Sequence, residues 1–400
     1  MRSRLSSVFA PTLCIFALTA NSFAQEISSE LPSAPVEVVY IVTGSSIQTY
    51  DVNAATGQPT QEGQPLTIPV FFPAIVPSSD GHFLYVQGND SHNMEHLLVY
   101  PTDSTGVPQF PAIENLIIPR TTGLLQLDPN SALAYASQST VDSKGDTHAE
   151  MRLFHIDTAT GTVTEDPNVV ATYPLNGPCL RGDNTPGFFG VFGFNPAGNR
   201  LYDIWTCSYY DTGGSTFYTQ QVNQQTGALS AAVQTFAVGD NELSGQLNLI
   251  YFTPKSLLYF DVPYDYVNGY NSLSVYPLSG GTTPTFTCTA AMLEACGYGT
   301  WAIPDPSGNF VFFNIGDTTQ ITRLDLPSKT ITDTGYYVSG YKQLFSPSDL
   351  LVYSQLSSTS APYFVDIYAF DPSTGAVTTS PEADIAVQQP LFSVVPAVRK

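Results

Sequence analysis

The sequence is poor in positive charge and in charged residues generally. Of its 400 residues, 13 are Lys or Arg and 34 are Asp or Glu; charged side chains make up 12 %, and the formal net charge is −21. Proteins that bind nucleic acid or anionic lipid by long-range attraction carry an excess of positive charge instead. The composition therefore argues against both partners and leaves sugars, peptides, cations and neutral small molecules as ligands.

Long apolar stretches are also missing after the first 24 residues. Arg2 and Arg4 precede an apolar stretch over residues 8–20, and small residues follow at 22–24, as a signal peptidase requires. No later segment approaches the roughly 20 apolar residues that span a bilayer. We expect a signal peptide over residues 1–24 cleaved near Ala24, a linker over 25–35, no membrane span, and a mature protein that is secreted or periplasmic.

Cysteine is scarce, and four of the five cysteines remain after cleavage: Cys179, Cys207, Cys288 and Cys296. An even number of cysteines in an oxidising compartment predicts disulfides. Cys179 and Cys207 are expected near each other, and Cys288 and Cys296 share one connecting segment. We expect two disulfides, with the pairing left open.

The common catalytic motifs are absent. No G-x-S-x-G elbow, H-E-x-x-H helix, Walker loop or dinucleotide-binding glycine pattern occurs. Residues 92–96 match the H-x-x-E-H zinc pattern by letters, but they run from a loop into a strand rather than along a helix. We therefore expect neither a metal nor a cofactor.

The sequence does contain a strand repeat. Seven times an apolar strand ends in a Pro- or Gly-marked turn and leads into a strand centred on an aromatic residue: Tyr40, Tyr85, Tyr135, Tyr202, Tyr259, Phe312 and Tyr353. A repeat of this length built only from strands is typical of β-propellers. The repeat predicts an all-β fold, a seven-bladed β-propeller over residues 36–397.

Two turn motifs recur within each repeat. Asn- or Asp-initiated turns ending in Thr-Gly, such as 53–57 and 371–375, are expected to close hairpins, because Gly adopts φ > 0 without Cβ strain. Pro-initiated turns such as 77–81 and 305–308 precede the aromatic strands. Residues 390–396 resemble an inner strand without its blade, and 36–42 start a blade without its inner strand. The propeller is therefore expected to be closed by pairing of the N- and C-terminal strands.

The remaining segments vary in length and are expected on one face: 88–95, 137–150, 204–215, 262–271, 173–190 and 286–300. Loops on a rigid scaffold often carry function, although drift in unconstrained loops gives the same pattern. Aromatic residues in or beside these segments are candidate ligand-binding residues that stack on a sugar or peptide: Tyr209, Tyr210, Tyr264, Tyr266, Tyr298 and Trp301. The alternative is that several of them complete blade packing.

Segments such as Val39-Tyr-Ile-Val-Thr-Gly44 and Asn195-Pro-Ala-Gly-Asn-Arg-Leu-Tyr202 resemble the seven-bladed lactonase-like propellers. This superfamily includes bacterial 6-phosphogluconolactonase, fungal muconate-lactonizing enzyme and the YVTN surface repeats. The resemblance covers nearly the whole mature chain. It implies a site of basic residues and a carboxylate near the channel mouth, including a Gly-Pro-Arg-His segment. Here the corresponding segment, 186–194, has neither Arg nor His, and Pro119-Arg120-Thr121 is the nearest match.

For a lactonase, the resemblance implies Arg120 or Arg181 as the group that polarises the lactone carbonyl. Asp183, Asp203 or Glu95 would orient or deprotonate the attacking water. Our first hypothesis is instead an exported monomeric propeller that binds an extracellular ligand, namely a glycan, peptide or protein, on its loops. A divergent metal-independent lactonase is the alternative, and a passive cell-surface repeat protein is a third possibility.

Overall fold

A computed structural model describes the following residues: 36–118, 125–141, 147–173, 188–207, 215–238, 250–252, 257–265, 270–277, 285–288, 292, 302–315, 317–340, 342–356, 361–397 and 399. All of them belong to the compact unit Ala34–Lys400, and the predicted signal peptide and linker lie outside them. In this part of the chain, no helix is long and apolar enough to cross a membrane.

The described strands form seven antiparallel sheets. The first sheet has the order β29-β1-β2-β3, with β1 (Val36–Thr43), β2 (Ser46–Asn53), β3 (Pro59–Thr67) and β29 (Leu391–Ala397). The second contains β4 (Phe71–Pro77), β5 (Phe83–Asn89), β6 (Glu95–Pro101) and β7 (Glu114–Ile118). The third contains β8 (Gln126–Leu127), β9 (Leu133–Val141), β10 (Thr147–Ile156) and β11 (Val163–Tyr173).

The other four sheets repeat this order. The fourth contains β12 (Phe188–Phe194), β13 (Arg200–Cys207), β14 (Ser215–Gln221) and β15 (Val233–Val238). The fifth contains β16 (Ile250–Phe252), β17 (Leu257–Asp265), β18 (Tyr270–Pro277) and β19 (Phe286–Thr287). The sixth contains β20 (Ala302–Pro304), β21 (Phe310–Ile315), β22 (Thr318–Asp325) and β23 (Thr330–Ser339). The seventh contains β24 (Lys342–Phe345), β25 (Leu351–Gln355), β26 (Tyr363–Asp371), β27 (Ala376–Val377) and β28 (Ala383–Val387).

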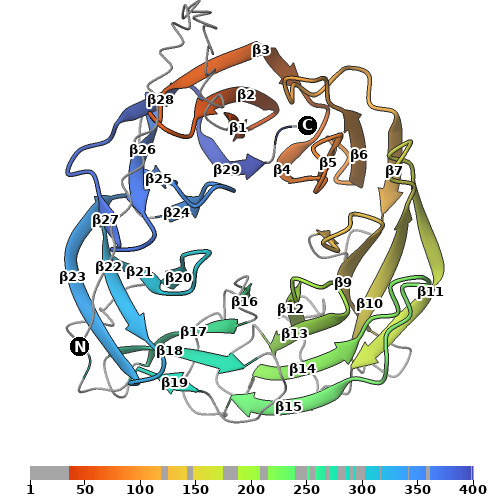
Figure 1. Cartoon of the computed structure of the whole chain (residues 1–400). Coiled ribbons are helices and arrows are strands. Elements are labelled where there is room, and N and C mark those ends of the chain that lie inside the picture. Colours follow the sequence, from red (N-terminus) through yellow and green to blue (C-terminus); the bar gives the residue numbers. More distant parts are fainter. Residues whose placement is uncertain are drawn as a thin grey trace, which may run out of the picture. The chain divides into compact units, whose positions relative to one another are not determined.

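The sheets follow one another around a common centre. Strands such as β4, β20, β24 and β29 lie on the inner side, and β3, β7, β11 and β23 lie on the outer side (Figure 1). This radial repetition of antiparallel sheets defines a β-propeller, which confirms the predicted all-β propeller class. β1 pairs with β2 and also with β29, for example Val42 with Ser393, so the two ends of the propeller chain share one sheet.

The seven repeated aromatic residues all lie on the second strand of a sheet, counting from the inner strand. Two of them show what the position does. The Tyr40 hydroxyl donates a hydrogen bond of 2.8 Å to the carbonyl oxygen of Gly106, and Tyr135 donates one of 2.7 Å to that of Gly227. Each acceptor belongs to the Thr-Gly turn of the following sheet, so the aromatic residue joins neighbouring sheets.

Both predicted turn types are present. In the turn at 53–57, Oδ1 of Asn53 accepts hydrogen bonds from the backbone N–H groups of Ala55 and Thr56, and Gly57 has φ +67°. The residue that ends each described Pro-marked turn also has positive φ, and its backbone N–H donates a hydrogen bond to the carbonyl oxygen three residues earlier. It is glycine in three of them, and Ser131 and Asp349 in two others: Gly81, Gly198, Gly308, Ser131 and Asp349.

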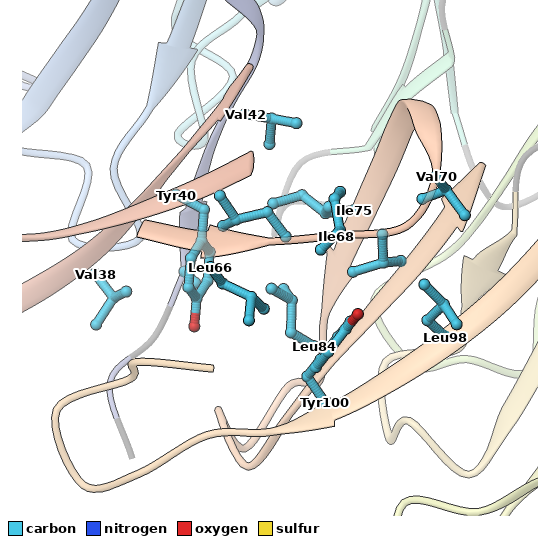
Figure 2. Packing of buried hydrophobic residues seen from close by; sticks show 13 residues of the cluster. Val38, Tyr40, Val42, Leu66, Ile68, Val70, Ile75, Leu84, Leu98 and Tyr100 are labelled. Carbon is cyan, nitrogen blue, oxygen red and sulfur yellow. The ribbon is translucent and has the colours of Figure 1, made fainter. Parts of the chain in front are cut away.

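The core fills the spaces between successive sheets. Between the first and second sheets, Val38, Tyr40 and Val42 of β1 pack with residues of β4, β5 and β6 (Figure 2). Successive side chains of a strand point to opposite faces of its sheet, so one strand contributes residues to the cores on both sides of the sheet. For example, Val39 and Ile41 pack with the seventh sheet instead.

Two segments that the sequence predicted as variable loops are partly strand. Within 88–95, only residues 90–94 form the turn between β5 and β6. Within 137–150, β9 extends to Val141 and β10 begins at Thr147. The hairpin pairs Val141 with Thr147, so the extra residues lengthen a pair of strands rather than a loop.

Candidate functional site on the loop face

Each sheet presents two different ends. We call "loop face" the end that carries the connection from the second to the third strand and the connection to the next sheet. We call "turn face" the end that carries the Pro-initiated and Thr-Gly turns. Of the candidate catalytic residues, Glu95 lies at the loop-face end, as the first residue of β6.

Glu95 is hydrogen-bonded to a buried glutamine. Nε2 of Gln87 donates a bond of 2.6 Å to Oε1 of Glu95, and Oε1 of Gln87 accepts a bond of 2.7 Å from the backbone N–H of Leu125. The backbone donor fixes which end of the amide is oxygen, so the amide nitrogen must face the carboxyl group. Leu125 directly precedes β8, and Gln87 therefore connects Glu95 to the third sheet.

Burial perturbs this carboxyl group. Glu95 is 9 % exposed, and desolvation raises its pKa from 4.5 to about 7, against the opposing effect of the bond from Gln87. A carboxyl group with a pKa near neutrality exchanges protons readily at physiological pH, as a general acid or base must. Raised pKa values also occur at purely structural positions, so the value identifies a candidate.

The neighbouring histidines point elsewhere. His96 follows Glu95 in the strand and therefore projects from the opposite face. Its Nδ1 lies 2.7 Å from Oδ1 of Asn115, and its Nε2 lies 3.3 Å from Oδ2 of Asp90. His92 also contacts Asp90, with its Nδ1 3.5 Å from Oδ2, so both histidines of the zinc pattern lie beside Asp90 rather than Glu95. The described residues contain no group of three or more His, Cys, Asp or Glu placed to hold a metal ion.

Asp90 closes the turn before Glu95. Its Oδ1 accepts hydrogen bonds of 2.8 Å from the backbone N–H groups of both His92 and Met94. The bond from Met94 is the largest of the effects that lower the pKa of Asp90. This carboxylate therefore serves as a turn cap, which fixes the start of β6 and with it Glu95.

Asp203 lies in a different environment. It is 0 % exposed, and the Tyr173 hydroxyl lies 3.0 Å from its Oδ2 and 2.6 Å from Oε1 of Gln220. Burial raises the pKa of Asp203 well above its usual value. The Tyr173 hydroxyl carries one hydrogen, which the two acceptors, Oδ2 of Asp203 and Oε1 of Gln220, therefore share. This network between the third and fourth sheets is closed to solvent, and its arrangement is that of a structural group.

The other candidate site residues cannot be placed beside Glu95. Those outside the described residues are Arg120, Arg181, Asp183, Tyr209, Tyr210, Tyr266, Tyr298, Trp301, Cys179 and Cys296. Tyr264 and Cys207 fall within β17 and β13. Cys288 is buried and disulfide-bonded, and the predicted pairing of the cysteines stays a prediction.

Sequence reasoning missed Gln87, whose position carries a detectable signal. It lies two residues after the repeated aromatic Tyr85, and the same position in other repeats holds Ser137, Asn314 and Gln355. Gln87 and these three residues are polar and nevertheless buried. Aligning the repeats on the aromatic residue would have revealed them.

No protein-family model matches the chain, and no curated protein matches its sequence. Solved structures do match. A candidate 6-phosphogluconolactonase from Bacteroides uniformis superposes with a TM-score of 0.63 at 19 % identity, covering 90 % of this chain and 99 % of its own. A second candidate 6-phosphogluconolactonase, from Bacteroides fragilis, gives 0.62 at 15 %, covering 92 % and 99 %. A hypothetical selenium-binding protein from Sulfolobus tokodaii gives 0.56 at 11 %, covering 91 % and 93 %.

At these identities, the likeness concerns the fold. The chain is a β-propeller, and its fold is similar to those of the two candidate 6-phosphogluconolactonases.

Proposed function

We propose that this chain is an exported, monomeric propeller that binds an extracellular glycan, peptide or protein on its loop face. In this proposal each of the seven sheets is one blade, and the β29–β1 pair closes the ring. A closed ring leaves no free inner edge and holds the loop-face ends of the strands in fixed positions.

The observation that carries the proposal is the polar group formed by Glu95 and Gln87. The turn face is occupied by repeated tight turns, whereas at the loop face a perturbed carboxyl group is held by an amide that also bonds the next sheet. Two hydrogen bonds limit the motion of Gln87, and such preorganisation favours binding. The net charge of −21 favours neutral or cationic ligands over polyanions.

The test is a binding screen of residues 25–400 against glycan and peptide arrays, followed by titration of each ligand found. Glu95→Gln should weaken binding at least about tenfold, as loss of a hydrogen bond to a charged group does. Glu382→Gln, which changes an exposed carboxylate near the Thr-Gly turn at Gly57, is the matched control. Binding that survives Glu95→Gln unchanged would place the ligand elsewhere.

Lactone hydrolysis is the second candidate function, because the pKa of Glu95 is near neutrality and two similar structures are candidate 6-phosphogluconolactonases. The Glu95 carboxylate would take a proton from water as the water oxygen bonds to the lactone carbonyl carbon. The ring C–O bond would then break, and the proton would pass to the leaving oxygen to give the hydroxy acid. Arg120 is the proposed group that polarises the carbonyl.

A panel of sugar and aliphatic lactones tests this function, with spontaneous hydrolysis subtracted. A hydrolase of this kind should show kcat/KM rising with pH through about 7, the pKa of Glu95. Glu95→Gln should reduce the rate by roughly 10²–10⁴-fold, the usual range for general base catalysis. Turnover by Glu95→Gln equal to that of the native protein would exclude Glu95 as the base, and no turnover on any lactone would leave the binding role.

A further inference from the structure

The outer edge of the second sheet has no neighbouring strand among the described residues. β7 is the last strand of this sheet and lies on the outer side of the propeller (Figure 1). Its pairing with β6 runs from Glu114 to Ile118 without a register shift, so the strand is regular. A regular edge strand presents a row of unpaired backbone N–H and C=O groups, to which another strand can add.

Other outer strands of the propeller are protected against such pairing. β3, β11, β15 and β23 each have a register shift against the strand that they pair with. β28 is regular, but it carries the exposed side chain of Asp384. Bulges and charged side chains are two of the means by which proteins block strand addition at a sheet edge. β7 has neither, because its one charged residue, Glu114, is partly buried.

The exposed side chains of β7 are apolar or neutral. Ile117 is 57 % exposed, and Asn115, two residues earlier, is exposed on the same face of the strand. Ile113, directly before β7, is 44 % exposed. Oδ1 of Asn115 lies 2.7 Å from Nδ1 of His96, which holds the amide in position. An added strand would therefore meet a fixed pattern of apolar and amide side chains, with which its own side chains can pair.

The charge of the second sheet is negative. Residues 71–118, which span this sheet, contain no Lys or Arg. They contain five acidic residues: Asp80, Asp90, Glu95, Asp103 and Glu114. A second copy of the chain, also with a net charge of −21, would be repelled from this edge, whereas a positively charged segment would be attracted to it.

We propose that the outer edge of β7 binds an extended, positively charged peptide segment of another protein by strand addition. Backbone hydrogen bonds to β7 supply the affinity, and alternate side chains of the peptide supply the specificity. Apolar side chains of the peptide pack on Ile113 and Ile117, and a basic side chain faces Glu114. This surface lies on the outer side of the propeller and not on the loop face, so the inference goes beyond the proposed function.

The probe is a fluorescently labelled peptide, acetyl-Lys-Val-Thr-Thr-Lys-Val-Lys-amide. In an antiparallel register, its two Val residues face Ile117 and Ile113, and the Lys between them faces Glu114. Fluorescence anisotropy with residues 25–400 should show saturable binding that weakens as salt is added, because salt screens the attraction.

Three variants of the probe separate the parts of the proposed interaction. One has Pro in place of both Thr residues, one has Glu in place of each Lys, and one has Ser in place of each Val. Each should bind at least about tenfold more weakly, through loss of backbone hydrogen bonds, of charge attraction and of apolar contact respectively. Equal binding by the Pro variant would mean attraction without strand addition and would overturn the proposal.

A substitution on the protein locates the binding surface. Ile117→Lys puts a positive charge on the exposed edge and should weaken probe binding at least about tenfold. Val233→Lys is the matched control, because Val233 is 60 % exposed on the outer strand β15, and it should leave binding unchanged. No saturable binding of the probe, or equal binding by the native protein and Ile117→Lys, would contradict the proposal.

Two measurements on the native protein keep the test decisive if Ile117→Lys does not fold. Hydrogen exchange should slow in β7 and not in β15 when the probe is added, and unchanged exchange in β7 would overturn the proposal. Sedimentation velocity without the probe should show one species at all concentrations. A dimer that the probe dissociates would assign the edge to a second copy of the chain instead.

Discussion

The side-chain amide of Gln87 holds the carboxyl group of Glu95 at 2.6 Å while its other end accepts a hydrogen bond from the next sheet. A single side chain thereby sets the position of the candidate acid–base group and the path of the chain into β8. Local chemistry and the packing of neighbouring sheets are therefore coupled at this point of the loop face.

Replacing Gln87 tests this coupling. Gln87→Met removes the donor that lowers the pKa of Glu95, so that pKa should rise above its present value of about 7. It also leaves the buried N–H of Leu125 without an acceptor, which should cost about 1–3 kcal/mol of folding free energy. Carboxyl ¹³C NMR titration and denaturant unfolding measure the two effects. Gln61→Met, on the exposed side of β3, should change neither.

The raised pKa of Glu95 also predicts how the stability of the fold depends on pH. Its folded pKa, about 7, is higher than the ordinary value of 4.5, so between these values the folded state binds more protons than the unfolded state. The contribution of Glu95 to stability is therefore lost as pH rises through this window, and it is constant above about pH 7. Glu95→Gln should make the slope of unfolding free energy against pH less negative between these values, by an amount that corresponds to at most about one bound proton. An unchanged slope between the two pH values would show that Glu95 titrates normally.

The repeat explains why so much of the fold was predictable. The strands, their aromatic residues and both turn types follow from local rules, because a Thr-Gly turn or a Pro-initiated turn needs only its own residues. Repetition then multiplied each weak local signal. The aromatic residues were predicted as strand centres, and the hydrogen bond from Tyr40 to Gly106 adds a role that only the neighbouring sheet reveals.

The candidate site was less predictable for a physical reason. Glu95 was named from the sequence, but its partner Gln87 is eight residues away on the adjacent strand, and their contact depends on the register of β5 and β6. Asp203 looked equally suitable, yet the packing of Tyr173 against it closes it to solvent. Burial and pairing between sheets are tertiary properties that residue type alone does not encode.

Replacing Asp349, on the turn face, by glycine is expected to stabilise the folded protein. It occupies the positive-φ position of a Pro-initiated turn, at φ +60°, where three other turns have glycine. Burial, and next the charge of Asp305, raise its pKa to about 7. Asp349→Gly should raise the midpoint of thermal unfolding, because it removes both the backbone strain and the desolvated carboxylate.

The gain should be larger at pH 8 than at pH 5. A raised pKa means that the carboxylate destabilises the fold above its unfolded value of 3.8, and increasingly so up to about pH 7. Ser131→Gly is the matched control at the same turn position. Ser131 accepts a hydrogen bond of 2.8 Å from the backbone N–H of Ser79, so its replacement should bring no gain. A destabilised Asp349→Gly protein would show that this carboxyl group has a structural partner.

The contacts of Arg399 are expected to help hold the chain after β29 in place. Its guanidinium donates a hydrogen bond of 2.7 Å to Oδ2 of Asp51 in β2 and one of 3.2 Å to the carbonyl oxygen of Ser104 in the second sheet. Arg399, two residues beyond the end of β29, is therefore tied to two sheets at once. Arg399→Gln should raise the pKa of Asp51 further, because burial already raises it and Arg399 opposes that effect. Unfolding free energy should fall by about 1 kcal/mol at low salt and by less at high salt, since the pair is partly exposed.

Hydrogen exchange of the paired strands β1 and β29 checks where the effect of Arg399→Gln is located. Faster exchange confined to these two strands would support the role of Arg399 in holding β29. Unchanged exchange there would show that β29 is held by its strand pairing alone.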